Sequence, residues 1–172
     1  NFSFHDMTKI LTVISNSKQL EYLRTQHPEY SQWKLACDNS GFYPMLDENQ
    51  LSYTKLDDWY LQPQWNAVNG WGAETTNRFI DFCGKSHFFT GVDWSSVLHL
   101  YLSHLLIHMV KNDLFASSLL EDTQPDRALI FWTEKRRQYP FFSGNFYLNY
   151  FLRERCLKKG IETLIVPLED QD

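Results

Sequence analysis

The first part of the chain, from Asp6 to about Asn39, carries apolar residues at helical spacing. The series begins with the apolar residues of Ile10 to Ile14 and ends with Trp33, Leu35 and Ala36. Residues that recur at this spacing predict two or three short helices. Pro28 is expected to break the series.

The next segment alternates between helical and loop patterns. Residues 47–60 are acidic and weakly amphipathic, which predicts a helix. Residues 61–72 hold a proline, two glycines and two asparagines, and they predict a loop that also carries tryptophans. A further helix is expected from Ala73 to Cys83, where Gly84 marks its end.

The most apolar element runs from Trp94 to Lys111. Eleven of its 18 residues are apolar and lie on all sides of a helix, which is typical of a helix buried by neighbours on most faces. Asp93 is placed to cap its first turn. A second short helix is expected over Leu114 to Leu120.

The last part of the chain changes character. Ala128 to Trp132 and Leu164 to Pro167 are short apolar runs of strand type, and Asn145 to Lys159 predicts the helix between them. A strand, a helix and a strand at this spacing predict a parallel pair with a right-handed connection. Because two strands alone are marginal, a third is expected, and we place it near Phe88 to Thr90.

We therefore predict an α+β fold that is predominantly helical. Its first two-thirds are helices around the central buried helix at about 94–111, and its end is a small βαβ unit. A length of 172 residues suits one domain over 1–172. The chain begins on Asn1 without an initiator Met, so we expect a trimmed chain or a fragment of a longer protein.

Composition narrows the class of protein. Three cysteines without CxxC spacing predict a reducing, cytoplasmic setting and exclude a zinc finger or a disulfide scaffold. The apolar stretch Val97 to Val110 is too short to span a bilayer. A net charge of -5 disfavours nucleic acid as a partner. We expect no membrane association, no metal and no cofactor, and the oligomeric state stays open.

Three histidines lie on the central helix. His104 and His108 are four residues apart and share a face, as two imidazoles on one metal do. His99 lies about 140–180° around the helix from them. We expect satisfied structural histidines here and no metal site.

A cysteine and a histidine lie close together near the central helix. Cys83 as nucleophile, His87 as base and Asp93 or Asp81 as the orienting carboxylate would form a hydrolase or transferase site. Cys83 is expected at the C-terminal end of its helix, where the dipole disfavours thiolate. The alternative is a buried structural cysteine.

The largest charge feature is a basic cluster between Lys135 and Lys159. It has a local charge of +6, so the remainder of the chain carries -11. Lys135, Arg136 and Arg137 follow a predicted strand and suit a phosphate or nucleotide, with Glu134 acting on the ligand. The helix C-terminus itself explains the cations at its end.

Aromatic residues make up 16% of the chain. Trp59, Trp65 and Trp71 fall in or near the predicted loop and would form a binding groove if they were exposed. The alternative is that these rings close the core.

The leading functional hypothesis is a non-enzymatic binding or regulatory domain. It would engage a protein or anionic partner through the basic patch and the aromatic loops. The alternatives are a cysteine-dependent hydrolase or transferase at Cys83 and His87, and a nucleotide or phosphate site at Lys135 to Arg137.

Overall fold

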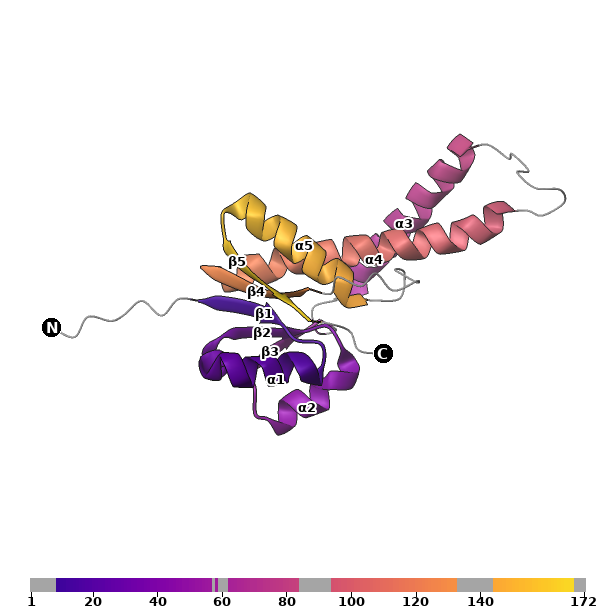
Figure 1. Ribbon diagram of the computed structural model, residues 1–172. Helices are drawn as coiled ribbons and strands as arrows, with labels where there is room; N and C mark the ends of the chain where they lie inside the picture. Colours follow the sequence, from indigo (N-terminus) through magenta and orange to yellow (C-terminus); the bar gives the residue numbers. More distant parts are fainter. Residues whose placement is uncertain (1–8, 57, 59–61, 84–93, 133–143, 169–172) are drawn as a thin grey trace. The chain divides into compact units, whose positions relative to one another are not determined.

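The computed structural model describes residues 9–56, 58, 62–83, 94–132 and 144–168 (Figure 1). The chain divides into two compact units. The first consists of Asn1–Trp59 with Asp113–Asp172, and the second is Tyr60–Asn112.

The first unit is built on a five-stranded sheet in the order β3-β2-β1-β4-β5. The strands are β1 (Ile10–Val13), β2 (Lys34–Cys37), β3 (Tyr53–Lys55), β4 (Arg127–Trp132) and β5 (Glu162–Pro167). Every neighbouring pair is parallel. The chain therefore moves outward from β1 in one direction and then crosses back to continue on the other side of β1.

Helices cover both faces of this sheet (Figure 1). The helices α1 (Ser17–Gln26) and α2 (Tyr43–Glu48) lie on one face, with short 3₁₀ helices at Pro28–Gln32 and Ser40–Phe42. The other face is covered by α5 (Gly144–Lys159) and by the end of α4 (Trp94–Thr123). Such a doubly wound arrangement buries both faces of a parallel sheet.

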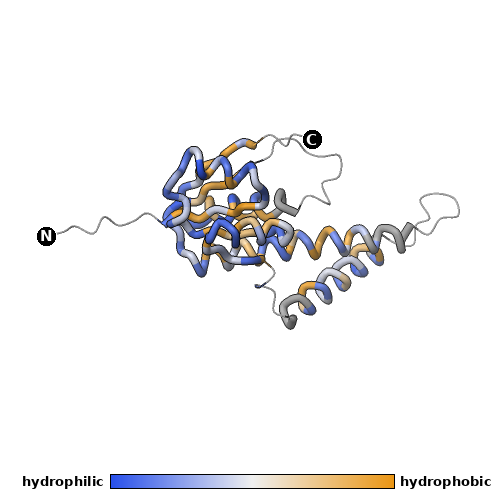
Figure 2. The backbone as a smooth tube through the Cα atoms, turned by 90° about the horizontal axis from the view of Figure 1, so that it is seen from below, coloured by the Kyte–Doolittle hydropathy of each residue, from blue (hydrophilic) through white to orange (hydrophobic). Residues whose placement is uncertain are grey.

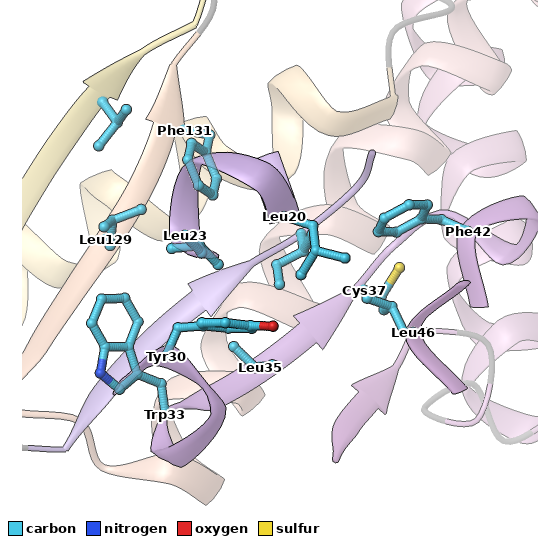
Figure 3. Close-up of a cluster of buried hydrophobic side chains, with 12 residues drawn as sticks. Leu20, Leu23, Tyr30, Trp33, Leu35, Cys37, Phe42, Leu46, Leu129 and Phe131 are labelled. Carbon is cyan, nitrogen blue, oxygen red and sulfur yellow. The ribbon is translucent and has the colours of Figure 1, made fainter. Parts of the chain in front are cut away.

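A hydrophobic core cluster lies between the sheet and α1 (Figure 3). Leu20 and Leu23 of α1 pack with Leu35 of β2 and with Leu129 and Phe131 of β4. Burial of a side chain of this size stabilises the fold by about 1.5–3 kcal/mol. On the opposite side the fully buried side chains include Phe115 and Leu119 of α4 and Leu148 and Leu152 of α5. Figure 2 shows apolar residues gathered along the strands of this unit.

The second unit contains α3 (Gln62–Cys83) and the first part of α4. Its two helices approach closely at Gly72, where an added Cβ would lie 2.5 Å from Cγ1 of Ile107. One turn on, the Ser103 hydroxyl donates to Thr76 Oγ1 at 3.0 Å, and Thr76 Oγ1 donates to Gly72 O at 2.8 Å. A side chain at position 72 would therefore force Ile107 to shift.

The prediction of a chain that mixes helices with a small parallel sheet is confirmed. The pairing of β4 with β5 is parallel, with α5 between them. The predicted helices over Ile10–Ile14 and Trp33–Ala36 are wrong, since β1 and β2 lie there. Short apolar runs fit a helix and a buried strand equally well, and here both strands lie in the middle of a sheet.

Other boundaries also differ. The predicted helix over 47–60 is replaced by the end of α2 and by β3, and the predicted loop over 61–72 lies almost entirely in α3. The central helix is present but continues to Thr123 without a break, and its buried residues in the described part are concentrated after residue 111. The strand expected near Phe88 to Thr90 lies outside the described residues.

None of the described helices combines sufficient length with sufficient apolar character to cross a membrane.

Candidate functional site

The candidate site lies at the carboxyl edge of the sheet, where β1 and β4 separate. The ladder between these strands ends at the pair Thr12 and Leu129. β1 continues beside β2 to Val13, and β4 continues beside β5 to Trp132. Beyond this pair, β1 is still bonded to β2 and β4 is still bonded to β5, but β1 and β4 are no longer bonded to each other. The hydrogen-bond ladder is therefore open between β1 and β4.

The loop after β1 is fixed by the first turn of α1. Asn16 is the N-cap of α1, and its Oδ1 accepts from the Gln19 amide at 3.0 Å. The Gln19 side chain reaches back, and its Oε1 accepts from the Ser15 amide at 2.6 Å. This reciprocal exchange follows the logic of a capping box and satisfies two amides of the helix entry.

Ser15 connects this loop with the end of β2. Its hydroxyl donates to Asp38 Oδ1 at 2.7 Å, and its carbonyl accepts from Asn39 Nδ2 at 2.9 Å. Ser15 is 1% exposed, whereas Asp38 is half-buried and Asn39 is exposed. Asn39 is itself held, because its Oδ1 accepts from the Gly41 amide at 3.1 Å. The result is a rigid polar corner that presents a carboxylate partly to solvent.

The end of β4 carries a second polar contact. Leu168 donates from its amide to Trp132 O, so that carbonyl points toward β5. Alternate carbonyls of a strand point to opposite neighbours, and Phe131 O therefore points toward β1, where the ladder has ended. Asn149 of α5, which is 7% exposed, donates from Nδ2 to this oxygen at 2.7 Å. A side chain thus replaces the missing strand partner.

Thr12 lies at the last paired position of β1. Its Oγ1 is the one buried side-chain oxygen or nitrogen without a hydrogen-bond partner among the described residues. A buried hydroxyl in this state costs stability because its hydration is not replaced. It faces the same side of the sheet as Ile14 of the core cluster, since strand side chains alternate between faces.

The cysteine site predicted from sequence is not tested. Cys83 is the last residue of α3, and His87 and Asp93 lie outside the described residues. Asp81 lies on α3 and is exposed. The other two cysteines, Cys37 and Cys156, are buried and are not joined in a disulfide, and burial raises the pKa of Cys156 to about 11.

The basic cluster divides into parts with different surroundings. Lys135, Arg136 and Arg137 lie outside the described residues. Arg155 is a structural residue, because its guanidinium forms a bidentate pair with the Asp113 carboxylate at 2.7 Å on both sides. That hydrogen bonding raises the pKa of Arg155.

The remaining described cations are distributed along α5. The Arg153 guanidinium lies 5.4 Å from the centre of the Trp132 ring, in a cation–π contact at the end of β4. Lys158 and Lys159 occupy the last turn of α5, as favoured by the helix dipole.

The aromatic groove of Trp59, Trp65 and Trp71 stays a prediction. Trp65 and Trp71 lie in α3, so they are not loop residues. Trp71 is 44% exposed. Trp59 lies outside the described residues.

The histidines of α4 behave differently from one another. His104 and His108 bring their Nε2 atoms to 3.0 Å, while His99 is half-buried and does not join them. Burial, followed by His104 and Lys111, lowers the pKa of His108. Within the described residues, no group of three or more histidine, cysteine and acidic side chains is arranged to hold a metal.

The polar corner was not found from the sequence, although a signal for it exists. Two buried runs, Leu11 to Ile14 and Leu35 to Cys37, are each followed at once by small polar or acidic residues. Once both runs are recognised as parallel strands, Ser15, Asp38 and Asn39 are expected to meet at one edge.

Comparison with known proteins returns no match among family models, curated proteins or solved structures.

Proposed function

We propose that this protein binds a small phosphorylated ligand with vicinal hydroxyls, of the nucleotide class, at the carboxyl edge between β1 and β4. The observation that carries the proposal is the strand order β3-β2-β1-β4-β5. In open parallel sheets, ligands bind outside the carboxyl ends of the strands at the point where the strand order reverses. In this sheet, that point is the junction of β1 and β4.

The polar corner supplies contacts for the hydroxyls of such a ligand. Asp38 follows β2 directly and lies 23 residues after Ser15. A carboxylate accepts hydrogen bonds from ligand hydroxyls, and an acidic residue about 20 residues beyond the first turn does so for ribose in doubly wound folds. The Ser15 hydroxyl and the Asn39 amide hold this corner in place before a ligand arrives.

The first turn argues against a dinucleotide. The residues between β1 and α1 are Ile14, Ser15 and Asn16, and none of them is glycine. The pyrophosphate of a dinucleotide approaches the backbone through a glycine-rich turn. A single nucleotide or a sugar phosphate fits this turn better.

The phosphate is assigned to the basic residues that follow β4 in the sequence. Lys135, Arg136 and Arg137 come three to five positions after Trp132. Three cations that follow the end of β4 this closely in the sequence favour an anionic group near it.

Calorimetry with nucleoside diphosphates tests the phosphate half of the proposal. The variant Arg136→Ala, Arg137→Ala is expected to weaken binding by about tenfold or more, because two cations are lost near the phosphate. Lys158→Ala, Lys159→Ala removes the same charge from the other end of α5, next to the amino end of β5, and serves as the matched control. Equal affinities in the two double variants, or affinity that does not change with salt, would count against the site.

A second measurement tests the hydroxyl half. Asp38→Asn is expected to weaken a ribonucleotide and to leave the matching 2′,3′-dideoxynucleotide unchanged, because only the former has hydroxyls for the carboxylate. If both ligands lose affinity equally, Asp38 supports the fold and does not read the hydroxyls.

The hypothesis of a non-enzymatic domain that engages a protein partner stays a prediction, as does catalysis by Cys83 and His87. No contact of the described residues favours either of them. Loss of turnover in Cys83→Ala, with nucleotide affinity retained, would favour the enzyme.

A further inference from the structure

A second candidate site lies in the other unit, on the part of α4 that precedes residue 113, and it is independent of the nucleotide proposal. His104 and His108 are four residues apart on this helix. Their Nε2 atoms lie 3.0 Å from each other, and their ring centres are 4.4 Å apart in an edge-to-face arrangement. Shared sequence spacing alone does not require this convergence, since each ring can rotate away from the other.

We infer that His104 and His108 form a two-histidine site for a divalent transition-metal ion of the nickel or copper class. Neutral imidazole is a preferred ligand of these ions. Both Nε2 atoms point to one place, and water would complete the coordination sphere.

The separation of the two nitrogens favours one geometry. At metal–nitrogen distances of about 2.0–2.1 Å, two ligands at a right angle lie about 2.8–3.0 Å apart, whereas two at a tetrahedral angle lie about 3.3–3.4 Å apart. The 3.0 Å between the Nε2 atoms is the hydrogen-bonded separation of the metal-free rings, and it is close to the right-angle value, so a right-angle site requires the smallest movement of the rings. Right angles occur in octahedral and tetragonal sites, which suit Ni²⁺ and Cu²⁺ better than Zn²⁺.

The hydrogen bond between the two rings does not prevent metal binding. Without a metal, one Nε2–H donates to the other Nε2. When a metal binds, the donor ring moves its proton to Nδ1, and both Nε2 lone pairs then face the ion without net loss of a proton.

The surroundings leave the pair accessible. Ser103 and Ile107, each one residue earlier, face α3 at Thr76 and Gly72. A shift of one residue turns a side chain by about 100° around the helix, so the histidines lie beside this contact. His104 is exposed, and an ion can therefore reach the site from solvent.

Titration calorimetry of the untagged full chain with Ni²⁺ alone tests the inference. We expect one Ni²⁺ per chain and a loss of at least about tenfold in affinity for His104→Ala and for His108→Ala. His99→Ala, on the same helix but outside the pair, is the matched control and should bind as the original chain does. Weaker binding of Zn²⁺ than of Ni²⁺ would further support the right-angle geometry.

Two results would overturn the inference. One is the absence of Ni²⁺ binding by the original chain, and the other is affinity in both alanine variants that equals that of His99→Ala. Circular dichroism checks that the helices remain. If His108→Ala loses helix, His104→Gln decides the question, because His104 is exposed and its replacement leaves the packing intact.

Discussion

Two buried hydroxyls at the end of β1 should respond oppositely to removal. Thr12 is 0% exposed and has no hydrogen-bond partner for Oγ1 among the described residues, while Ser15 is 1% exposed and donates to the Asp38 carboxylate. Thr12→Val and Ser15→Ala each remove one hydroxyl from a site closed to water. The first variant replaces an unsatisfied polar group by a methyl group of the same shape, and the second breaks a bond to a charged acceptor.

The magnitudes follow from these surroundings. A buried hydroxyl without a partner costs about 1–3 kcal/mol, so Thr12→Val should raise the free energy of unfolding by about 1 kcal/mol or more. A hydrogen bond to a charged group contributes about 1.5–3 kcal/mol. Because Asp38 is half-buried and water replaces part of this bond, we expect Ser15→Ala to lower the free energy of unfolding by about 1–2 kcal/mol.

Urea unfolding followed by circular dichroism measures both changes. With a slope of about 2 kcal/mol per molar urea, the midpoints should move by about 0.5–1 M in opposite directions at an unchanged slope. The reasoning is refuted if Thr12→Val lowers the midpoint, or if both variants shift it in the same direction. A changed slope would mean that the substitution altered the unfolded state instead.

Three further predictions concern packing, charge and pH. Gly70→Ala should stabilise α3 by roughly 0.5–1 kcal/mol, because a Cβ at this position meets open space. Gly72→Ala should destabilise α3 by roughly 1–2 kcal/mol, because the facing isoleucine must move. Equal shifts of the thermal unfolding midpoint in the two variants would contradict this prediction. Arg155→Lys should lower the urea midpoint by an amount equivalent to about 0.5–1 kcal/mol, because lysine cannot form the bidentate pair with Asp113. The difference between the variant and the original chain should shrink in high salt. A difference that does not depend on salt would mean that packing, and not charge, is responsible. Burial raises the pKa of Cys156 from 9.0 to about 11, so the thiol loses its proton at a lower pH in the unfolded chain than in the folded chain. The free energy of unfolding should therefore fall by roughly 1–3 kcal/mol as the pH rises from 9 to 11. Cys156→Ala should flatten this part of the pH profile, and a profile identical to that of the original chain would argue against a role of Cys156.

The sequence was sufficient to predict elements that have clear start and stop signals on both sides. β4, α5 and β5 were predicted because Gly160 ends a long helix between two short apolar runs, and their parallel pairing followed from connection length. The prediction missed the strands β1 and β2, because Leu11 to Ile14 and Leu35 to Cys37 are fully buried and show no alternation of buried and exposed positions. Such a run has no period that separates a strand from a helix.

The candidate site depended on the same error. Ser15 and Asp38 are 23 residues apart, and they become neighbours only because β1 and β2 are adjacent and parallel. Asn149 is harder still, since its hydrogen bond to Phe131 exists only where a ladder ends. The convergence of His104 and His108 depends on side-chain torsions, which residue spacing leaves open.

The central place of β1 has a consequence for synthesis. One neighbour of β1 is β2, but the other is β4, and the hydrogen bond from Lys9 to Asp126 joins residues 117 apart. At about 5–20 residues per second, a ribosome delivers β4 roughly 6–23 s after β1. During that interval a nascent half-sheet of β1, β2 and β3 carries an unpaired apolar edge, which is the form most open to aggregation. Chains that stop before β4 should therefore be captured by chaperones or lost as aggregates, because β4 is the strand that covers this edge of β1.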